Sequence, residues 1–147
     1  MKELEYPFDA AYIIKKRKSL KKALLADGTS RIRKKIAVFG GSTTSDIVKT
    51  LELFLLDAGI EPEFYESEYA QYFQDAMFPD ETLLSFKPDI VFIHTTNRNV
   101  TDWPEMTDTT EQIDEKLHTE INRFTAMWKS IAEKFHCPII QNNFEMP

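Results

Sequence analysis

Apolar residues near the N-terminus recur with a helical period. Tyr12, Ile13, Leu20, Leu24 and Leu25 follow this spacing, and the pair Asp27-Gly28 supplies a stop signal. We therefore predict a leading helix within an N-terminal helical segment that covers residues 1–32.

The next stretch changes from a strand pattern to a helix pattern. The run Ile36–Phe39 is apolar throughout and ends at Gly40, which is typical of a buried parallel strand. Apolar residues then return every three or four positions over residues 47–58, after an N-cap at Thr44 or Ser45. This pattern predicts a strand, a glycine-containing turn and an amphipathic helix.

The rest of the chain continues this alternation. We predict an edge strand flanked by acids at 61–67, short helices at 70–78 and 80–86, a strand at 90–93, a long helix at 109–135 and a strand at 138–140. Strands that alternate with helices imply a parallel sheet with right-handed crossovers and helices on both faces. We therefore assign the α/β class, with a three-layer doubly wound parallel sheet and an N-terminal helical lead-in.

Polar residues follow each predicted strand, at positions 40–44, 65–67, 94–97 and 141–143. In open parallel sheets, ligands bind outside the carboxyl ends of the strands, near the reversal in strand order. We therefore expect a binding site at this edge, and its candidate residues are Gly40, Gly41, Ser42, Thr43, His94, Thr96, Asn97 and Asn142.

The glycine-containing turn is the most informative of these segments. Gly40 and Gly41 are two of only four glycines, and the helix after them directs free N–H groups toward Ser42, which favours an anion or oxyanion. Ser42 is a candidate nucleophile, although a serine hydroxyl needs a base and oxyanion donors. The alternative is that Ser42 and its neighbours cap the helix. No lysine occupies the Walker position, which argues against a nucleotide P-loop.

His94 is the histidine that this interpretation places at a ligand-facing strand end, as a candidate base or oxyanion donor. The alternative is a hydrogen-bonded core histidine. The three histidines have no paired spacing and Cys137 is the single cysteine, so we predict no metal site, no cofactor and no internal disulfide. Residues 97–111 are polar and predict a loop over the site edge, anchored by Trp103-Pro104, or else a surface loop in which Asp108 or Thr109 caps the long helix.

Composition limits the partners. A chain of 147 residues fits one globular domain, and a net charge of -6 with a pI near 5.1 argues against nucleic acid or an anionic membrane surface. The basic residues at 15–22 form either the solvated side of the leading helix or a docking patch for an acidic partner. No run of 18 apolar residues and no secretory pattern is present, so we expect a cytoplasmic protein.

The stretch IAVFGGSTTSDIVKTLELFLLDAGIEPEFYESEYAQYFQDAMFPDETLLSFKPDIVFIHTTNRN, together with PIIQNNFEMP at the end of the chain, resembles the N-terminal domain of FkbH-like proteins. These are haloacid dehalogenase-type phosphatases of subfamily IIIC. The resemblance implies an SGNH-hydrolase-like, flavodoxin-like domain at residues 33–147 of a longer multidomain protein. It also implies two partners, a downstream phosphatase-like domain and an acyl carrier protein, since some members load glyceryl units from a phosphorylated glycerate onto such carriers.

The comparison with the wider SGNH superfamily implies an incomplete hydrolase. The first block of that superfamily reads Gly-Asp-Ser with a nucleophilic serine, and here Gly41 replaces the aspartate before Ser42. Asn97 is the best match for the asparagine that contacts the oxyanion. The Asp-x-x-His block that supplies the general base has no counterpart before Pro147, and no Asp-x-Asp phosphatase motif occurs.

These residues and this resemblance lead to one main expectation of function. We expect a hydrolase-like domain that is catalytically incomplete by itself and binds a small acyl, glyceryl or carrier-linked group for a downstream phosphatase or transferase domain. One alternative is a serine esterase in which Ser42 is the nucleophile and the base lies outside the chain. The other is a structural or partner-docking module.

Overall fold

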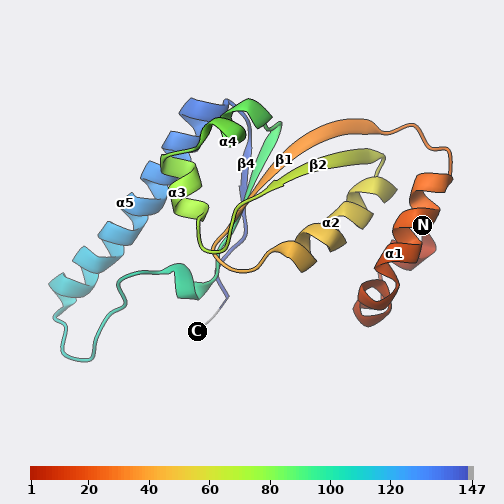
Figure 1. Ribbon diagram of the computed structural model, residues 1–147. Coiled ribbons are helices and arrows are strands. Elements are labelled where there is room, and N and C mark those ends of the chain that lie inside the picture. Colours follow the sequence, from red (N-terminus) through yellow and green to blue (C-terminus); the bar gives the residue numbers. More distant parts are fainter. Residues whose placement is uncertain (146–147) are drawn as a thin grey trace.

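Four parallel strands form the centre of the molecule. In the computed structural model, which describes residues 1–145, these strands have the order β2-β1-β3-β4, where β1 is Ile32–Gly40, β2 is Ile60–Glu66, β3 is Ile90–His94 and β4 is Ile139–Gln141. All three pairings are parallel. Helices lie on both faces of the sheet (Figure 1), so the protein has the doubly wound, flavodoxin-like α/β fold that the alternation of elements predicts.

The helices form unequal layers on the two faces. The described helices are η1 (Lys2–Leu4), α1 (Ala10–Ala26), α2 (Ser45–Asp57), α3 (Tyr72–Met77), α4 (Glu81–Phe86), η2 (Asn97–Asn99) and α5 (Thr110–Phe135). Figure 1 shows α3, α4 and α5 on one side of the sheet and α2 on the other, with α1 packed on the outside of α2. The predicted N-terminal lead-in is therefore confirmed as an added helical layer.

Capping residues set the ends of several helices. Thr109 and Gln112 form a capping box at the start of α5, in which Gln112 Oε1 accepts from the Thr109 N–H at 2.8 Å. Asp80 caps α4 by accepting from the Leu83 N–H at 2.8 Å. Thr44 occupies the N-cap position of α2, but its side chain makes no capping hydrogen bond.

Strand β1 begins four residues earlier than the apolar run that predicts it. Its first part pairs with β2, from Ile32 opposite Ile60 to Lys35 opposite Glu63. Backbone pairing extends β1 here although Arg33 is exposed and the two lysines after it are only half-buried. The sequence pattern indicates burial and therefore misses a paired segment that solvent reaches. Strand β2 lies at the edge of the sheet, as its flanking acids predict.

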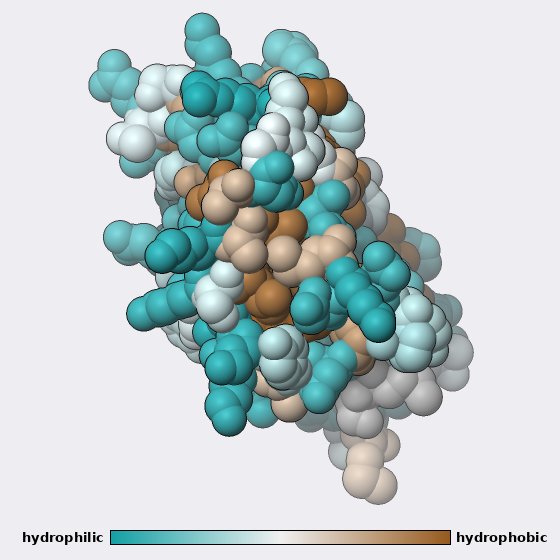
Figure 2. Space-filling view, turned by 90° about the vertical axis from the view of Figure 1, so that its right-hand side faces the viewer, coloured by the Kyte–Doolittle hydropathy of each residue, from teal (hydrophilic) through white to brown (hydrophobic). Residues whose placement is uncertain are grey.

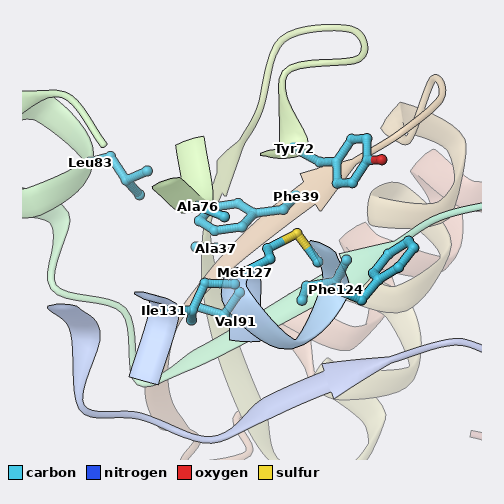
Figure 3. Packing of buried hydrophobic residues seen from close by; sticks show 10 residues of the cluster. Ala37, Phe39, Tyr72, Ala76, Leu83, Val91, Phe124, Met127 and Ile131 are labelled. Carbon is cyan, nitrogen blue, oxygen red and sulfur yellow. The ribbon is translucent and has the colours of Figure 1, made fainter. Parts of the chain in front are cut away.

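The sheet core lies between the sheet and helices α3, α4 and α5. Figure 3 shows side chains from β1 and β3 directed toward Met127 and Ile131 of α5 and Ala76 of α3. Its buried members are Ala37, Phe39, Tyr72, Ala76, Leu83, Val91, Ile93, Phe124, Met127 and Ile131. Phe39 and Val91 are fully buried shortly before the polar ends of their strands, so this core fixes the position of those ends.

The helix-pair core lies on the other side, between α1 and α2. Its buried members are Leu4, Ile13, Leu20, Leu24, Leu53 and Leu56. Helix α1 still exposes much of Tyr12, Ile14 and Leu25. Figure 2 shows this side of the molecule, where apolar side chains gather in the middle of a polar surround. Within residues 1–145, no helix is both long and apolar enough to cross a membrane.

Candidate functional site

The candidate site lies at the carboxyl ends of β1 and β3. The chain passes from β1 to β2 on one side and then to β3 on the other, so the strand order reverses between β1 and β3. Gly40 is paired with His94, and the Gly41 N–H donates to the His94 carbonyl at 2.8 Å. Ser42 and His94 therefore belong to neighbouring strand ends at the switch point, where open α/β sheets bind ligands.

Asn99 explains why glycine occupies position 41. A Cβ atom on Gly41 would lie 2.3–2.5 Å from the side-chain amide of Asn99, which donates to the Gly41 carbonyl at 3.0 Å. A Cβ atom on Gly40 would lie 2.6 Å from Thr44 Cγ2. Contacts within the chain thus account for both glycines, and a role for them in ligand binding stays a prediction.

The side-chain amide of Asn99 also organises the segment after β3. Its Oδ1 accepts from the Thr96 N–H at 2.8 Å and completes a capping box for η2. Thr96 Oγ1 in turn accepts from the Arg98 N–H at 3.3 Å. One asparagine therefore joins the turn after β1 to the turn after β3.

A partly buried ion pair attaches this segment to α5. Arg123 donates from Nη2 to the Asn99 carbonyl at 2.6 Å and to Glu120 Oε2 at 2.7 Å, and from Nη1 to the Tyr72 hydroxyl at 2.9 Å. Glu120 accepts from the N–H and the hydroxyl of Thr101 through its other oxygen. The segment around η2 is consequently held by hydrogen bonds on both sides.

The ionisation of this pair follows from its contacts. Burial opposes the charge of Glu120, but hydrogen bonds from Arg123 and Thr101 outweigh it, so the pKa of Glu120 is lowered from its usual value of 4.5. Burial likewise opposes the charge of Arg123, and its bonds to Glu120 and Tyr72 nevertheless raise the pKa of Arg123. Both groups are charged at neutral pH.

The end of β4 is closed by Asn142. Its Oδ1 accepts from the Thr95 N–H at 3.0 Å and its Nδ2 donates to the Thr95 carbonyl at 2.8 Å. Gln141 donates to the Thr95 hydroxyl at 3.1 Å and accepts from the Trp128 indole at 2.6 Å. The side-chain amide of Asn142, a predicted site residue, therefore forms two hydrogen bonds with the backbone just after β3.

The end of β2 is closed in a similar way. The Ser67 N–H donates to the Val38 carbonyl at 2.9 Å, and the Ser67 hydroxyl donates to Asp75 at 2.5 Å. Tyr65 lies beside it, where burial, with Asp75 and Asp80 nearby, raises the pKa of its hydroxyl to about 12. Ser67 and Asp75 are therefore bound to each other at this end of the sheet.

The remaining predicted site residues make fewer side-chain hydrogen bonds. Ser42 is half-buried, and its hydroxyl makes no hydrogen bond to another residue in the described part of the chain. His94 is half-buried beside Phe92, and its Nδ1 is buried with no partner within residues 1–145. Asn97 begins η2 and is half-buried, whereas Thr43 is exposed.

The chemistry available at the switch point is therefore limited. No carboxylate or imidazole hydrogen bonds to Ser42 within residues 1–145, so no described residue activates its hydroxyl. The same residues contain no group of three or more His, Cys, Asp and Glu side chains that could hold a metal ion. A serine hydroxyl at the start of a helix can still donate a hydrogen bond to an oxygen of a bound molecule.

Asn99, Glu120 and Arg123 are absent from the candidates that the sequence supplies. Two signals point to them in retrospect. The spacing from Thr96 to Asn99 is that of a capping box. Glu120 lies one helical turn before Phe124, so it interrupts the core-facing side of α5 with a charge, and a buried charge requires a partner.

An apolar groove adjoins this site on the side of α5. We call it the α5 groove; its volume is about 460 Å³. One wall is the exposed part of the apolar side of α5 together with Phe124, the opposite wall is the segment 100–104, and Gln141 and Phe144 also line the groove. Val100 directly follows Asn99, and Gln141 directly precedes Asn142, so the groove begins where the polar site ends.

Comparisons with known proteins show the fold and no more. Neither the models of protein families nor the curated proteins include a match to this chain. A crystal structure described as the N-terminal part of the protein BF1531 from Bacteroides fragilis, containing a phosphatase domain and complexed with Mg, is similar in fold, with a TM-score of 0.68 and 18% sequence identity. The match covers 89% of this chain and 34% of that one, so the chain spans about a third of its structural neighbour.

Proposed function

We propose that this chain is the SGNH-like N-terminal domain of an FkbH-like enzyme, and that it binds a small acyl, glyceryl or carrier-linked group for a downstream phosphatase or transferase domain. The observation that carries the proposal is the hydroxyl of Ser42, which is half-buried at the switch point and has neither a hydrogen-bond partner nor a base within residues 1–145. A hydroxyl in this position suits binding rather than covalent catalysis. The likeness in fold to a structure that contains a phosphatase domain supports the same proposal.

Binding of a small thioester tests this proposal. The probe is the acetyl thioester of N-acetylcysteamine, titrated into the ¹⁵N-labelled chain. We expect shifts of the amide signals of residues 40–44 and 94–97, and a loss of affinity of about two- to tenfold in Ser42→Ala because one hydrogen bond is removed. Ser85→Ala, which alters an exposed serine on α4, is the matched control and should bind normally.

The esterase alternative is tested in the same samples. Hydrolysis of p-nitrophenyl acetate by the chain, or by a longer polypeptide that contains it, would have to disappear in Ser42→Ala if Ser42 were a nucleophile. We expect no Ser42-dependent turnover by the chain alone. Turnover that depends on Ser42 in the chain alone would contradict the proposed binding role.

A docking role has one specific observation in its favour. Helix α1 carries six of the 18 basic residues and none of the 24 acidic ones, which leaves 12 basic against 24 acidic residues, or a charge of -12, elsewhere. Two of the six are paired across to α2, Arg17 with Asp46 and Lys21 with Glu52, each at 2.7 Å. The helix therefore suits a partner with a negative surface, such as an acidic carrier protein, and such binding must weaken as ionic strength rises.

A further inference from the structure

The apolar side of helix α5 is larger than the part that the sheet core uses. Phe124, Met127 and Ile131 are buried in the core. A row of four residues beside this part of the helix and nearer its start remains exposed by 37–55% and consists of Ile113, Leu117, Ile121 and Trp128. An apolar row of this kind on a helix that is already packed points to a binding surface.

The wall opposite this row is held in place by hydrogen bonds. Lys116 on α5 donates to the Trp103 carbonyl at 3.1 Å and forms ion pairs with Asp108 at 2.9 Å and Asp102 at 3.4 Å. At the other end of the same wall, Thr101 donates to Glu120. The segment 100–104 is therefore fixed to α5 at two points, and these contacts hold the wall of the α5 groove.

The size and the charges of the groove select the class of ligand. Its volume of about 460 Å³ lies within the range of small-molecule sites, which is about 300–1,000 Å³. Lys116 and Glu120 are the charged side chains on its α5 wall, and both are engaged within the chain. Apart from Asp102 and Gln141, the remaining lining consists of aliphatic and aromatic side chains, so the groove suits a flexible aliphatic chain.

The position of the groove indicates how an aliphatic ligand would be oriented in it. One end, at Val100 and Gln141, meets the polar site, where Asn99 and Asn142 are the adjacent residues in the sequence. A molecule with a polar carbonyl end and an aliphatic tail can therefore occupy both regions at once. This continuity is why we commit to a small amphiphile rather than to a protein partner that covers α5.

We propose that the α5 groove binds the aliphatic chain of an acyl ligand whose carbonyl end lies at the switch point beside Ser42. The position of the carbonyl end rests on the proposed function, whereas the binding of the aliphatic chain depends only on the groove. The ligand class that follows is a medium-chain acyl thioester or ester, in preference to an acetyl or glyceryl group.

The two tryptophans of the chain, Trp103 and Trp128, both line the groove, so intrinsic fluorescence reports on its occupancy. The experiment titrates the whole chain with N-acetylcysteamine thioesters of acetyl, butyryl, hexanoyl, octanoyl and decanoyl groups. We expect a blue shift of the emission and an affinity that rises about fourfold for each added methylene until the groove is filled. Affinity that does not depend on chain length overturns the inference.

Substitutions test whether the groove itself binds the aliphatic chain. Leu117→Glu places a charge in the groove and should remove the dependence on chain length, whereas Leu25→Glu changes a similarly exposed leucine on α1 and should leave it intact. Both leucines are largely exposed, and circular dichroism with thermal unfolding checks that both variants fold. A wild-type dimer that Leu117→Glu dissociates, without chain-dependent binding, would show that a second copy covers the groove and would overturn the inference.

The same titrations distinguish failure of the inference from failure of the proposed function. Acetyl thioester binding that Ser42→Ala weakens, with no gain from longer chains, contradicts the groove and leaves the proposed function in place. Chain-dependent binding that Leu117→Glu removes but Ser42→Ala does not change supports the groove and contradicts the proposed position of the carbonyl end.

Discussion

The sheet core and the helix-pair core stabilise different parts of the molecule. The sheet core joins β1 and β3 to α5, and the residues next in sequence to its members form the candidate site, as with Phe39 before Gly40. The helix-pair core joins α1 to the outside of α2, away from the strand ends. The difference shows that a buried residue supports the site only if it lies on an element that carries site residues.

The largest effect that tests this comparison is loss of a fully buried side chain from each core. Phe39→Ala should lower the free energy of unfolding by about 3–5 kcal/mol and Leu24→Ala by about 2–5 kcal/mol, because each leaves a cavity. Urea unfolding measures both. The amide signals of residues 94–97 should move in Phe39→Ala and stay in Leu24→Ala.

Equal changes of those signals in the two variants would show that the cores act as one unit and would break the comparison. Phe39→Leu is the second variant in case the alanine protein does not fold. It keeps most of the apolar volume and should shift the same signals by a smaller amount.

A smaller effect concerns the link between the two strand ends. Gly41→Ala should lower the free energy of unfolding by about 1–3 kcal/mol, because its Cβ displaces the amide of Asn99. In an Asn99→Ala background the same substitution should cost much less, with a coupling of about 0.5–3 kcal/mol. Urea unfolding of the four proteins measures this coupling, and additive costs would mean that Asn99 does not determine the choice of glycine.

The smallest effect concerns pH and compares an ion pair from each side. The folded pKa of Glu120 is lowered below 4.5, so its contribution to stability is complete above that pH and is lost as the pH falls through the folded pKa. Glu120→Gln should cost about 1 kcal/mol at pH 7, and this cost should shrink as the pH falls below 4.5 and through the folded pKa. The matched control is Asp46→Asn, which removes an exposed pair between α1 and α2 and should show a much weaker pH dependence.

Unfolding in urea at several pH values measures both variants. The other carboxylates whose pKa is lowered, such as Asp89 and Asp108, are present in both proteins and cancel in the comparison. If Asp46→Asn reduced the loss of stability at low pH more than Glu120→Gln did, the pair of Glu120 and Arg123 would not contribute more to this pH dependence than the pair of Arg17 and Asp46.

Periodicity predicted the layers of this fold because burial repeats along the chain. The helix 47–58 and the capped start of the long helix near Thr109 follow from local rules and are confirmed. The early start of β1 was missed, since its ladder forms where side chains meet solvent. The length of a strand depends on its partner as well as on its own sequence.

The candidate site was predictable in place but not in its internal contacts. The rule for strand ends located Ser42 and His94 at adjacent ends. It could not indicate Asn99, whose amide contacts Gly41 across 58 positions, nor the bond from Arg123 to the Asn99 carbonyl across 24 positions. Contacts between distant residues leave no periodic signal, and the rule for strand ends selected Asn97 rather than Asn99. The ligand-binding role of the predicted residues stays a prediction.

The two edges of the sheet carry different safeguards against fibre growth. Strand β2 presents Pro62, which has no N–H to donate, between the carboxylates of Glu61 and Glu63. Strand β4 is three residues long, so an incoming strand would gain few hydrogen bonds there even though Ile140 is exposed by 54%. Charge and proline at one margin and brevity at the other thus discourage the stacking of copies through their sheets.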